Sequence, residues 1–347
     1  MSLLTYSGIT TKVRAMQSHL LSEEQFHEMA GLEDVRSAAD YLKQLPTYAE
    51  IFAGVDDSNL HRGHIEQLLT LSEYRDFAKL YRFSNLPQRR FLDLYFMHYE
   101  INIIKRILRH VMGHQETVLD LSMFQEFFDR HSNIDLPALA QSENLEDFLS
   151  RLKGSPYYEF LSELASKETC TMFDLEMNLD LFYFRTQWKV KNKMLSREER
   201  HALEQCFGCR LDLLNIQWIY RACHYYHLLP SDIYALLIPV NYKLKPDQIR
   251  HLAESADNEE FFSVLRETFY WKFQKGEITG KPDIETLYHQ ICNQIYANAG
   301  RRYPYSVAIL DSYLYSKELE LQKIITTLEG IRYRLDAGEI IALVEKQ

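Results

Sequence analysis

Glycine and proline are scarce in this sequence of 347 residues. It contains 12 glycines and 9 prolines, where average usage would give roughly 24 and 17. Because these two residues supply most tight turns, a chain with so few of them has few short loops. The shortage disfavours β-sandwiches, β-barrels and doubly wound nucleotide-binding folds, and it favours long helices. One hydrophobic core rarely spans this length, so we expect two or three subdomains.

Three further shortages exclude whole classes of protein. Five widely spaced cysteines do not make a disulfide framework and fit a reducing compartment. A net charge of −10 at pH 7 excludes a generally basic surface for nucleic acid, although a local basic patch stays open. No uncharged apolar run approaches the ~18 residues that cross a bilayer, and the N-terminus lacks the apolar core of a signal peptide. We therefore expect a cytoplasmic protein without nucleic acid and without direct membrane insertion.

The motifs of common enzyme classes are missing as well. Residues 276–282 come closest to a phosphate-binding loop, but the spacing is one residue short and a proline stands where a magnesium-binding hydroxyl is required. Glu176 and Asp180 have the spacing of carboxylate-bridged metal sites, but also of an ordinary acidic stripe on a helix. Cys206 and Cys209 form a CxxC pair with no second pair at zinc-binding spacing. We predict no catalytic residue, cofactor or metal, and keep a carboxylate metal enzyme as an alternative.

Two short patterns each recur three times along the chain. In the first pattern, an acidic residue, two aromatic or apolar residues, two further residues and a leucine precede a tyrosine. The alignment pairs Tyr41 with Phe148 and Leu45 with Leu152, and the three tyrosines are Tyr48, Tyr157 and Tyr270. In the second, an acid is followed by mostly apolar residues at helical spacing, and the three acids are Glu100, Asp212 and Glu318, 112 and 106 residues apart. Two patterns that keep step three times indicate an internal repeat.

The repeated acids lie at the centre of an apolar stripe. At 100° per residue, Ile103, Ile104 and Ile107 surround the direction of Glu100 on a helix. A carboxylate in that position must be paired, hydrogen-bonded or neutralised, because desolvating it alone costs several kcal/mol. Either three equivalent acids face a shared axis or channel, or each acid ties its helix to a neighbour through a tyrosine, an arginine or a helix N-terminus.

Other positions of the second pattern are candidate structural or socket residues too. Asn215 follows Asp212 on the same predicted helix face, and Arg109 and Arg221 close the first two copies, where a cation favours the helix dipole. The third copy has Thr327 in place of the arginine. The repeat predicts three helical units, 1–114, 115–228 and 229–347, with joins near Gly113 and Pro230.

At this point the sequence resembles the C subunit of the bacterial and archaeal V/A-type rotary ATPases, which corresponds to the d subunit of the eukaryotic vacuolar enzyme. The similarity runs nearly end to end. The segments that carry it are 12–21, 42–48, 99–109, 212–221, 237–244 and 313–327. Each motif is degenerate, but their order and spacing together are fairly specific.

The resemblance implies an all-α, funnel-shaped protein of three similar helical bundles with pseudo-threefold symmetry. It implies a non-catalytic part of the central stalk that couples the rotor shaft, made of the D and F subunits, to the cytoplasmic face of the membrane proteolipid ring. Such a part serves ATP-driven H⁺ or Na⁺ transport or ATP synthesis, as a member of a membrane-bound complex. An all-helical scaffold or adaptor of another assembly is the alternative.

Overall fold

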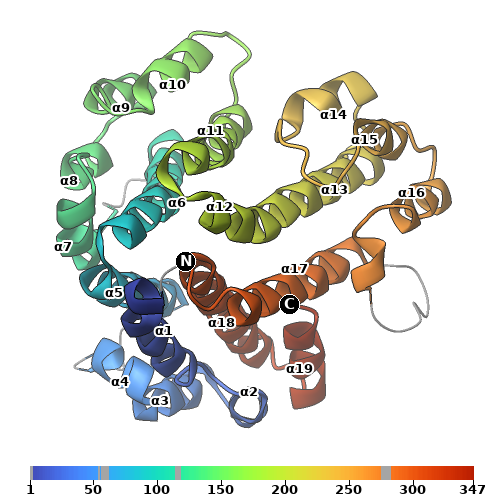
Figure 1. Ribbon diagram of the computed structural model, residues 1–347. Helices are drawn as coiled ribbons and strands as arrows, with labels where there is room; N and C mark the ends of the chain where they lie inside the picture. Colours follow the sequence, from blue (N-terminus) through green and yellow to red (C-terminus); the bar gives the residue numbers. More distant parts are fainter. Residues whose placement is uncertain (1–2, 54, 56–61, 114–118, 275–282) are drawn as a thin grey trace. The chain divides into compact units, whose positions relative to one another are not determined.

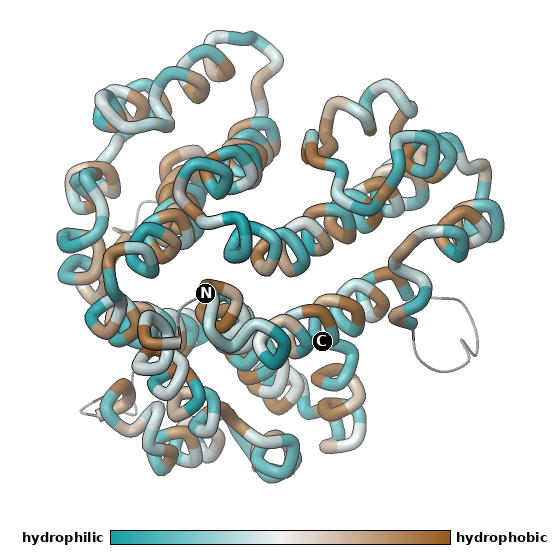
Figure 2. Tube along the Cα trace, in the orientation of Figure 1, coloured by the Kyte–Doolittle hydropathy of each residue, from teal (hydrophilic) through white to brown (hydrophobic). Residues whose placement is uncertain are grey.

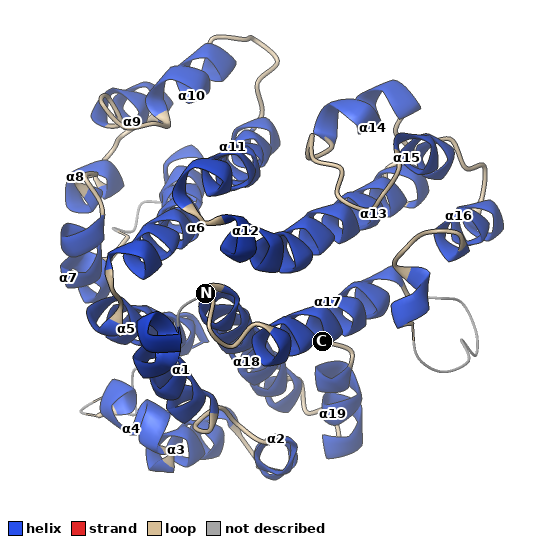
Figure 3. Cartoon of the chain, viewed as in Figure 1, coloured by secondary structure: helices blue, strands red, loops and turns tan. Residues whose placement is uncertain are grey.

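Every regular element of the described chain is a helix (Figures 1 and 3). The computed structural model describes residues 3–53, 55, 62–113, 119–274 and 283–347. The prediction of an all-α chain is confirmed, since no strand occurs in those ranges. Gly113 is the C-cap of one long helix, and Pro230 is the first residue of a short one, so both predicted joins are helix ends.

The chain forms two compact units. Residues 85–195 make the smaller unit, and residues 1–84 and 196–347 together make the larger one. The described part of the smaller unit contains α6 (Leu86–Met112), α7 (Ser122–His131), α8 (Leu136–Ala140), α9 (Leu145–Arg151), α10 (Tyr158–Ala165) and α11 (Met172–Met194). The borders of these units differ from those of the three sequence units, which describe the repeat and stay a prediction.

The larger unit combines both ends of the chain. Its N-terminal helices are α1 (Leu3–Gln17), α2 (Glu23–Ala30), α3 (Val35–Gln44), α4 (Pro46–Phe52) and α5 (Arg62–Phe83). Its middle part contains α12 (Arg197–Leu203), a π-helical turn (Glu204–Gly208), α13 (Cys209–His224), α14 (Pro230–Leu236), α15 (Pro246–Ala253) and α16 (Asn258–Arg266). Its last helices are η3 (Trp271–Phe273), α17 (Ile284–Arg302), α18 (Ala308–Arg332) and α19 (Ala337–Glu345).

Three sets of helices share one order of packing. In the first set, α11 runs antiparallel along α6, with Arg109 near Glu176 at one end and Leu94 near Gln187 at the other. In the second set α17 packs along α13, and in the third set α5 packs along α18. Shorter helices attach to α6, α13 and α18 in a matching order, and in the third set they come from both chain ends: α19 from the C-terminus, α2 and α3 from the N-terminus.

Helix caps show where the copies of the first pattern correspond. Asp34, Asn144 and Asp257 each cap a helix by accepting a hydrogen bond from the backbone N–H three residues later. Counted from these caps, the buried leucine eight residues on is Leu42, Leu152 and Leu265. The sequence comparison paired Leu45 with Leu152, which is three residues out of register. Tyr41, paired there with the buried Phe148, instead donates to Glu28 at the surface.

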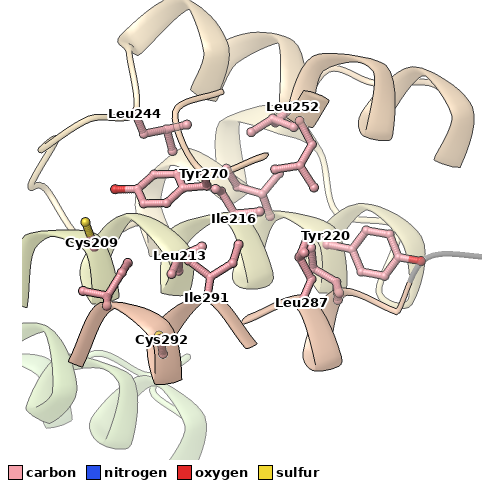
Figure 4. Packing of buried hydrophobic residues seen from close by; sticks show 14 of the residues in the cluster. Cys209, Leu213, Ile216, Tyr220, Leu244, Leu252, Tyr270, Leu287, Ile291 and Cys292 are labelled. Atoms are coloured by element: carbon pink, nitrogen blue, oxygen red, sulfur yellow. The ribbon is translucent and has the colours of Figure 1, made fainter. Parts of the chain in front are cut away.

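The core of the second set is packed around α13. Leu213, Ile216 and Tyr270 lie together between α13, α17 and the segment after α16 (Figure 4). The π-helical turn before α13 ends in Gly208, where a Cβ atom would lie 2.6 Å from the Tyr242 ring. A side chain at 208 would therefore push Tyr242 away from the helix. Apolar and polar residues alternate along most helices (Figure 2), whereas the start of α18, from Ala308 to Tyr315, is buried on all sides.

Candidate functional site

The smaller unit contains one contact between a repeated tyrosine and a repeated acid. Tyr157 is fully buried, and its hydroxyl donates to Oε2 of Glu100 over 2.5 Å. The hydroxyl of Ser132 donates to the other carboxylate oxygen. Burial and the negative charge of Glu100 raise the pKa of Tyr157 far above its usual range, so the phenol remains a proton donor. The contact ties α6 to the segment that begins α10.

In the second contact, which lies in the larger unit, the carboxylate accepts more hydrogen bonds than Glu100 does. Tyr270 donates to Oδ2 of Asp212 over 2.5 Å, and both residues are fully buried. Three consecutive backbone N–H groups, of Tyr242, Lys243 and Leu244, also donate to this carboxylate over 2.6 to 3.0 Å. Burial raises the pKa of Asp212 above its usual range, and these hydrogen bonds oppose that rise. Asp212 thus holds the segment before α15 against α13.

The third contact joins the two ends of the chain. Tyr48 donates to Oε2 of Glu320 over 2.8 Å, across 272 residues of sequence. The fully buried Lys317 lies 2.6 Å from the same carboxylate oxygen and 2.9 Å from the Tyr48 hydroxyl. The backbone N–H of Leu21 donates to Oε1 of Glu320 over 2.7 Å. Among the residues that the structure describes, an ion pair reinforces this contact and neither of the other two.

The structure places Glu320, rather than Glu318, in line with Glu100 and Asp212. Glu318 is half-buried and faces Arg210 of α13 at 3.5 Å. Two residues turn a helix by about 200°, so the two acids of α18 lie on opposite sides. The sequence alignment selects Glu318 because Leu321 and Ile325 lie at helical spacing from it, whereas Lys323 and Thr327 lie at that spacing from Glu320.

The contacts also cross from one copy of the repeat to the next. Within each predicted unit the tyrosine precedes the acid, for example Tyr157 before Asp212. In the structure the acid instead accepts from the tyrosine that follows it, 57 residues on for Glu100 and 58 residues on for Asp212. Glu320 has no following copy and is paired with Tyr48 of the first. Spacing in the sequence could not distinguish these two pairings.

The two repeated arginines form ion pairs with the neighbouring long helix. Arg109 contacts Glu176 of α11 through two hydrogen bonds, 2.5 Å from Nε and 2.9 Å from Nη2. This acceptor raises the pKa of Arg109 above its usual range. Arg221 contacts Glu285 of α17 at 2.8 Å. Each pair joins the C-terminal part of one helix to the N-terminal part of its antiparallel partner.

The third set keeps this ion pair with the charges exchanged. Nine residues after Glu320, at the position of Arg109 and Arg221, stands Glu329, which contacts Arg62 of α5 at 3.1 Å. The sequence alignment assigns Thr327 to this position and predicts that the cation is lost. The shift by two residues that misplaced Glu318 explains this error too.

Asn215 binds both the backbone N–H and the carbonyl oxygen of Ile238, a buried loop residue, through its side-chain amide. Its side-chain amide donates to the carbonyl oxygen of Ile238 over 3.0 Å and accepts from the Ile238 N–H over 2.9 Å. Asn215 is fully buried. It therefore fastens the segment after α14 to α13, one turn from Asp212.

Comparison with known proteins identifies the family. The model of the ATP synthase (C/AC39) subunit family matches residues 9–343. The chain belongs to this family. The C subunit of the A-type ATP synthase of Methanosphaera stadtmanae is 23% identical over 330 residues, 92% of this chain and 82% of the relative. The proteins of the same name from Thermococcus onnurineus and Archaeoglobus fulgidus are 25% and 22% identical, over 96% of this chain and 87% and 94% of their own lengths.

In this C/AC39 chain, residues considered as metal ligands are used otherwise. Asp180 accepts from Lys105 at 2.8 Å, and Glu176 is held by Arg109. Cys206 and Cys209 are buried, and burial raises the pKa of the Cys209 thiol to about 12, so neither thiolate is favoured.

No group of three or more His, Cys, Asp or Glu side chains could hold a metal ion within the described ranges. Residues 276–282, compared above with a phosphate loop, lie outside the described residues. Among the residues that are described, no helix has the length and apolar composition needed to span a bilayer.

Proposed function

We propose that the chain is a non-catalytic part of the central stalk of a V/A-type ATPase or ATP synthase. In this role it couples the rotor shaft, made of the D and F subunits, to the proteolipid ring at the cytoplasmic face of the membrane. The observation that carries the proposal is the family match across residues 9–343, together with relatives named as C subunits of A-type ATP synthases. The complex would use the coupling for H⁺ or Na⁺ transport or for ATP synthesis.

The proposal includes three similar helical bundles with pseudo-threefold symmetry, arranged as a funnel. The shared packing order of the three helix sets supports it, as does the tyrosine–carboxylate contact that each set contains. In this arrangement the third bundle is completed by both ends of the chain. The sequence units 1–114, 115–228 and 229–347 are then copies of one ancestral helical unit.

Stiffness is the physical requirement of a part that transmits torque. Each helix that carries one of these acids is fixed at the acid by a charge-assisted hydrogen bond from a buried tyrosine, which is about twice as strong as a neutral hydrogen bond. Near its C-terminal end each is fixed again by an ion pair to its antiparallel partner. We infer that Glu100, Asp212 and Glu320 are structural ties inside the bundles and not a shared socket for the shaft.

A reconstitution tests the coupling role. The full chain is mixed with the purified D/F pair of the same organism, and separately with the detergent-solubilised proteolipid ring, at two salt concentrations. Co-elution with both in gel filtration is the expected result. Binding to neither would overturn the proposal and leave the alternative, a helical scaffold of another assembly, for which a genomic position away from rotary ATPase genes would be the second sign.

A further inference from the structure

An exposed line of basic residues on α11 contrasts with the acidity of the chain. Residues 181–197 contain five cations and no acid, although the whole sequence has 49 acidic residues in 347. Three of these cations, Arg185, Lys189 and Lys193, stand four residues apart on α11 and are exposed. Side chains at this spacing share one helix face and advance about 6 Å per step. We call these three residues the α11 basic face.

The α11 basic face has no structural use within the described part of the chain. None of its three side chains has a hydrogen bond or an ion pair there, whereas Lys191 between them is buried with its ammonium 3.9 Å from the Trp188 ring centroid. The helix dipole favours cations only in the last turn, so it accounts for Lys193 but not for Arg185 or Lys189. The N-terminal half of α11 differs, because its acids Glu176 and Asp180 are ion-paired with α6.

A similar face recurs on the corresponding helix of the third set. α5 packs along α18 as α11 packs along α6, and its C-terminal half exposes Arg75, Lys79 and Arg82. Of these, Lys79 contacts Asp76 at 3.1 Å. The corresponding part of α17 exposes the uncharged Ala297 and Asn298, and its exposed cations, Arg301 and Arg302, are adjacent residues confined to the last turn. The basic face is therefore present in two sets of three and is not demanded by the helix packing.

We propose that the α11 basic face docks an acidic helix of the rotor shaft. The identity of this partner rests on the proposed function. Three cations in a line of about 12 Å fit carboxylates at every fourth residue of a helix lying alongside. Charges act over about 8 Å at physiological ionic strength, so a short acidic helix experiences mainly this local field. A long polyanion or an anionic membrane would also meet the acidic remainder of the chain, which disfavours both.

Charge reversal on the full chain tests the inference. The triple variant Arg185→Glu, Lys189→Glu, Lys193→Glu is compared with a control that reverses three other exposed cations of the same unit, Arg130→Glu, Lys153→Glu and Lys167→Glu. Both variants change the net charge equally. Their affinities for the purified D/F pair are measured at 50 and 200 mM salt, after circular dichroism and thermal unfolding have verified the fold. We expect the α11 variant to lose affinity at least tenfold and to lose most of its salt dependence, and the control to bind like the wild type.

The other outcomes separate the two proposals. Equal affinity of the α11 variant and the wild type would overturn this inference and leave the coupling role intact. A wild-type chain that does not bind the D/F pair would instead contradict the proposed function. Vesicles of phosphatidylcholine and phosphatidylglycerol at 7:3 form a third arm. Wild-type binding to these vesicles that the α11 variant loses, with unchanged binding to D/F, would assign the face to a membrane and overturn the inference.

Discussion

Asp212 and Glu320 hold corresponding positions in two helix sets, yet different groups neutralise them. Three backbone N–H groups and the Tyr270 hydroxyl surround Asp212, and no cation is hydrogen-bonded to it in the described structure. Glu320 accepts from one backbone N–H, from Tyr48 and from a fully buried lysine. The residue three positions before Glu320 is Lys317, and the residue three positions before Asp212 is Cys209.

This difference shows what a buried acid needs at such a position. Fixed backbone dipoles suffice where a loop such as 242–244 can wrap around the carboxylate. In the contact between Tyr48 and Glu320, the charge of Lys317 on the same helix compensates the buried carboxylate, as the N–H groups of 242–244 do for Asp212. The tyrosine is the shared element, and the remaining partners depend on the local chain path.

The largest effect is expected from removing the carboxylate at the second contact. Asp212→Ala leaves three backbone N–H groups, of which that of Leu244 is in a buried residue, and the buried Tyr270 hydroxyl without an acceptor, so the free energy of unfolding should fall by about 4 kcal/mol. Urea denaturation followed by circular dichroism measures the change. A loss below about 1 kcal/mol would mean that water or a rearranged loop satisfies these donors, and the contrast with Glu320 would disappear.

Removing the cation from the third contact should have the next largest effect. Lys317→Met strands the charge of Glu320, and we expect a loss of about 3 kcal/mol in the same denaturation experiment. Methionine is the residue at the corresponding position 97 of the first set, so the substitution fits a helix of this kind. The double variant with Glu320→Met should recover most of the stability, because it removes the stranded charge as well. No recovery would show that packing, and not charge, decides the contact.

In the described structure, another buried acid of the larger unit, Asp311, lacks the partners that Asp212 and Glu320 have, and it makes stability depend on pH. Asp311 is buried, its Oδ2 has no hydrogen-bond partner among the described residues, and burial raises its pKa to about 7 against the opposing charge of Arg210. The folded chain thus holds this proton up to about pH 7, whereas the unfolded chain releases it near pH 4. Stability therefore falls as pH rises through this window.

Asp311→Asn should remove that penalty. We expect the variant to exceed the wild type by about 2 kcal/mol in the free energy of unfolding at pH 8, with no gain at pH 4. Paired urea titrations at the two pH values measure the difference. An equal effect at both pH values would contradict a titrating Asp311 and point to packing.

The smallest effect is expected at Glu318. Its ion pair with Arg210 is long, at 3.5 Å, and both side chains are about one-fifth exposed, so Glu318→Gln should cost less than about 1 kcal/mol. Glu320→Gln in the same assay serves as the comparison and should cost more, because it leaves Lys317 buried without its counterion. Equal losses would indicate that the two acids of α18 share the role that the structure gives to Glu320.

Much of the local structure could be predicted from residues near one another in the chain. The helical class follows from scarce glycine and proline together with apolar spacing, and Gly113 and Pro230 marked real helix ends. That Glu100 and Asp212 would need partners followed from their place in an apolar stripe. Their individual partners could not be predicted, because a tyrosine 52 residues before an acid and one 58 residues after it are equally compatible with a repeat.

The sequence by itself determined the helices, the repeat and the need to compensate acids that face apolar neighbours, since these depend on spacing within a few helical turns. Only the tertiary structure showed that Glu320, and not Glu318, accepts the hydrogen bond from the tyrosine. It also showed that Tyr48, near the start of the chain, supplies this hydrogen bond. Such choices depend on which helix faces meet across hundreds of residues. The energy of a buried carboxylate is set by the groups around it in space and not by its neighbours along the chain.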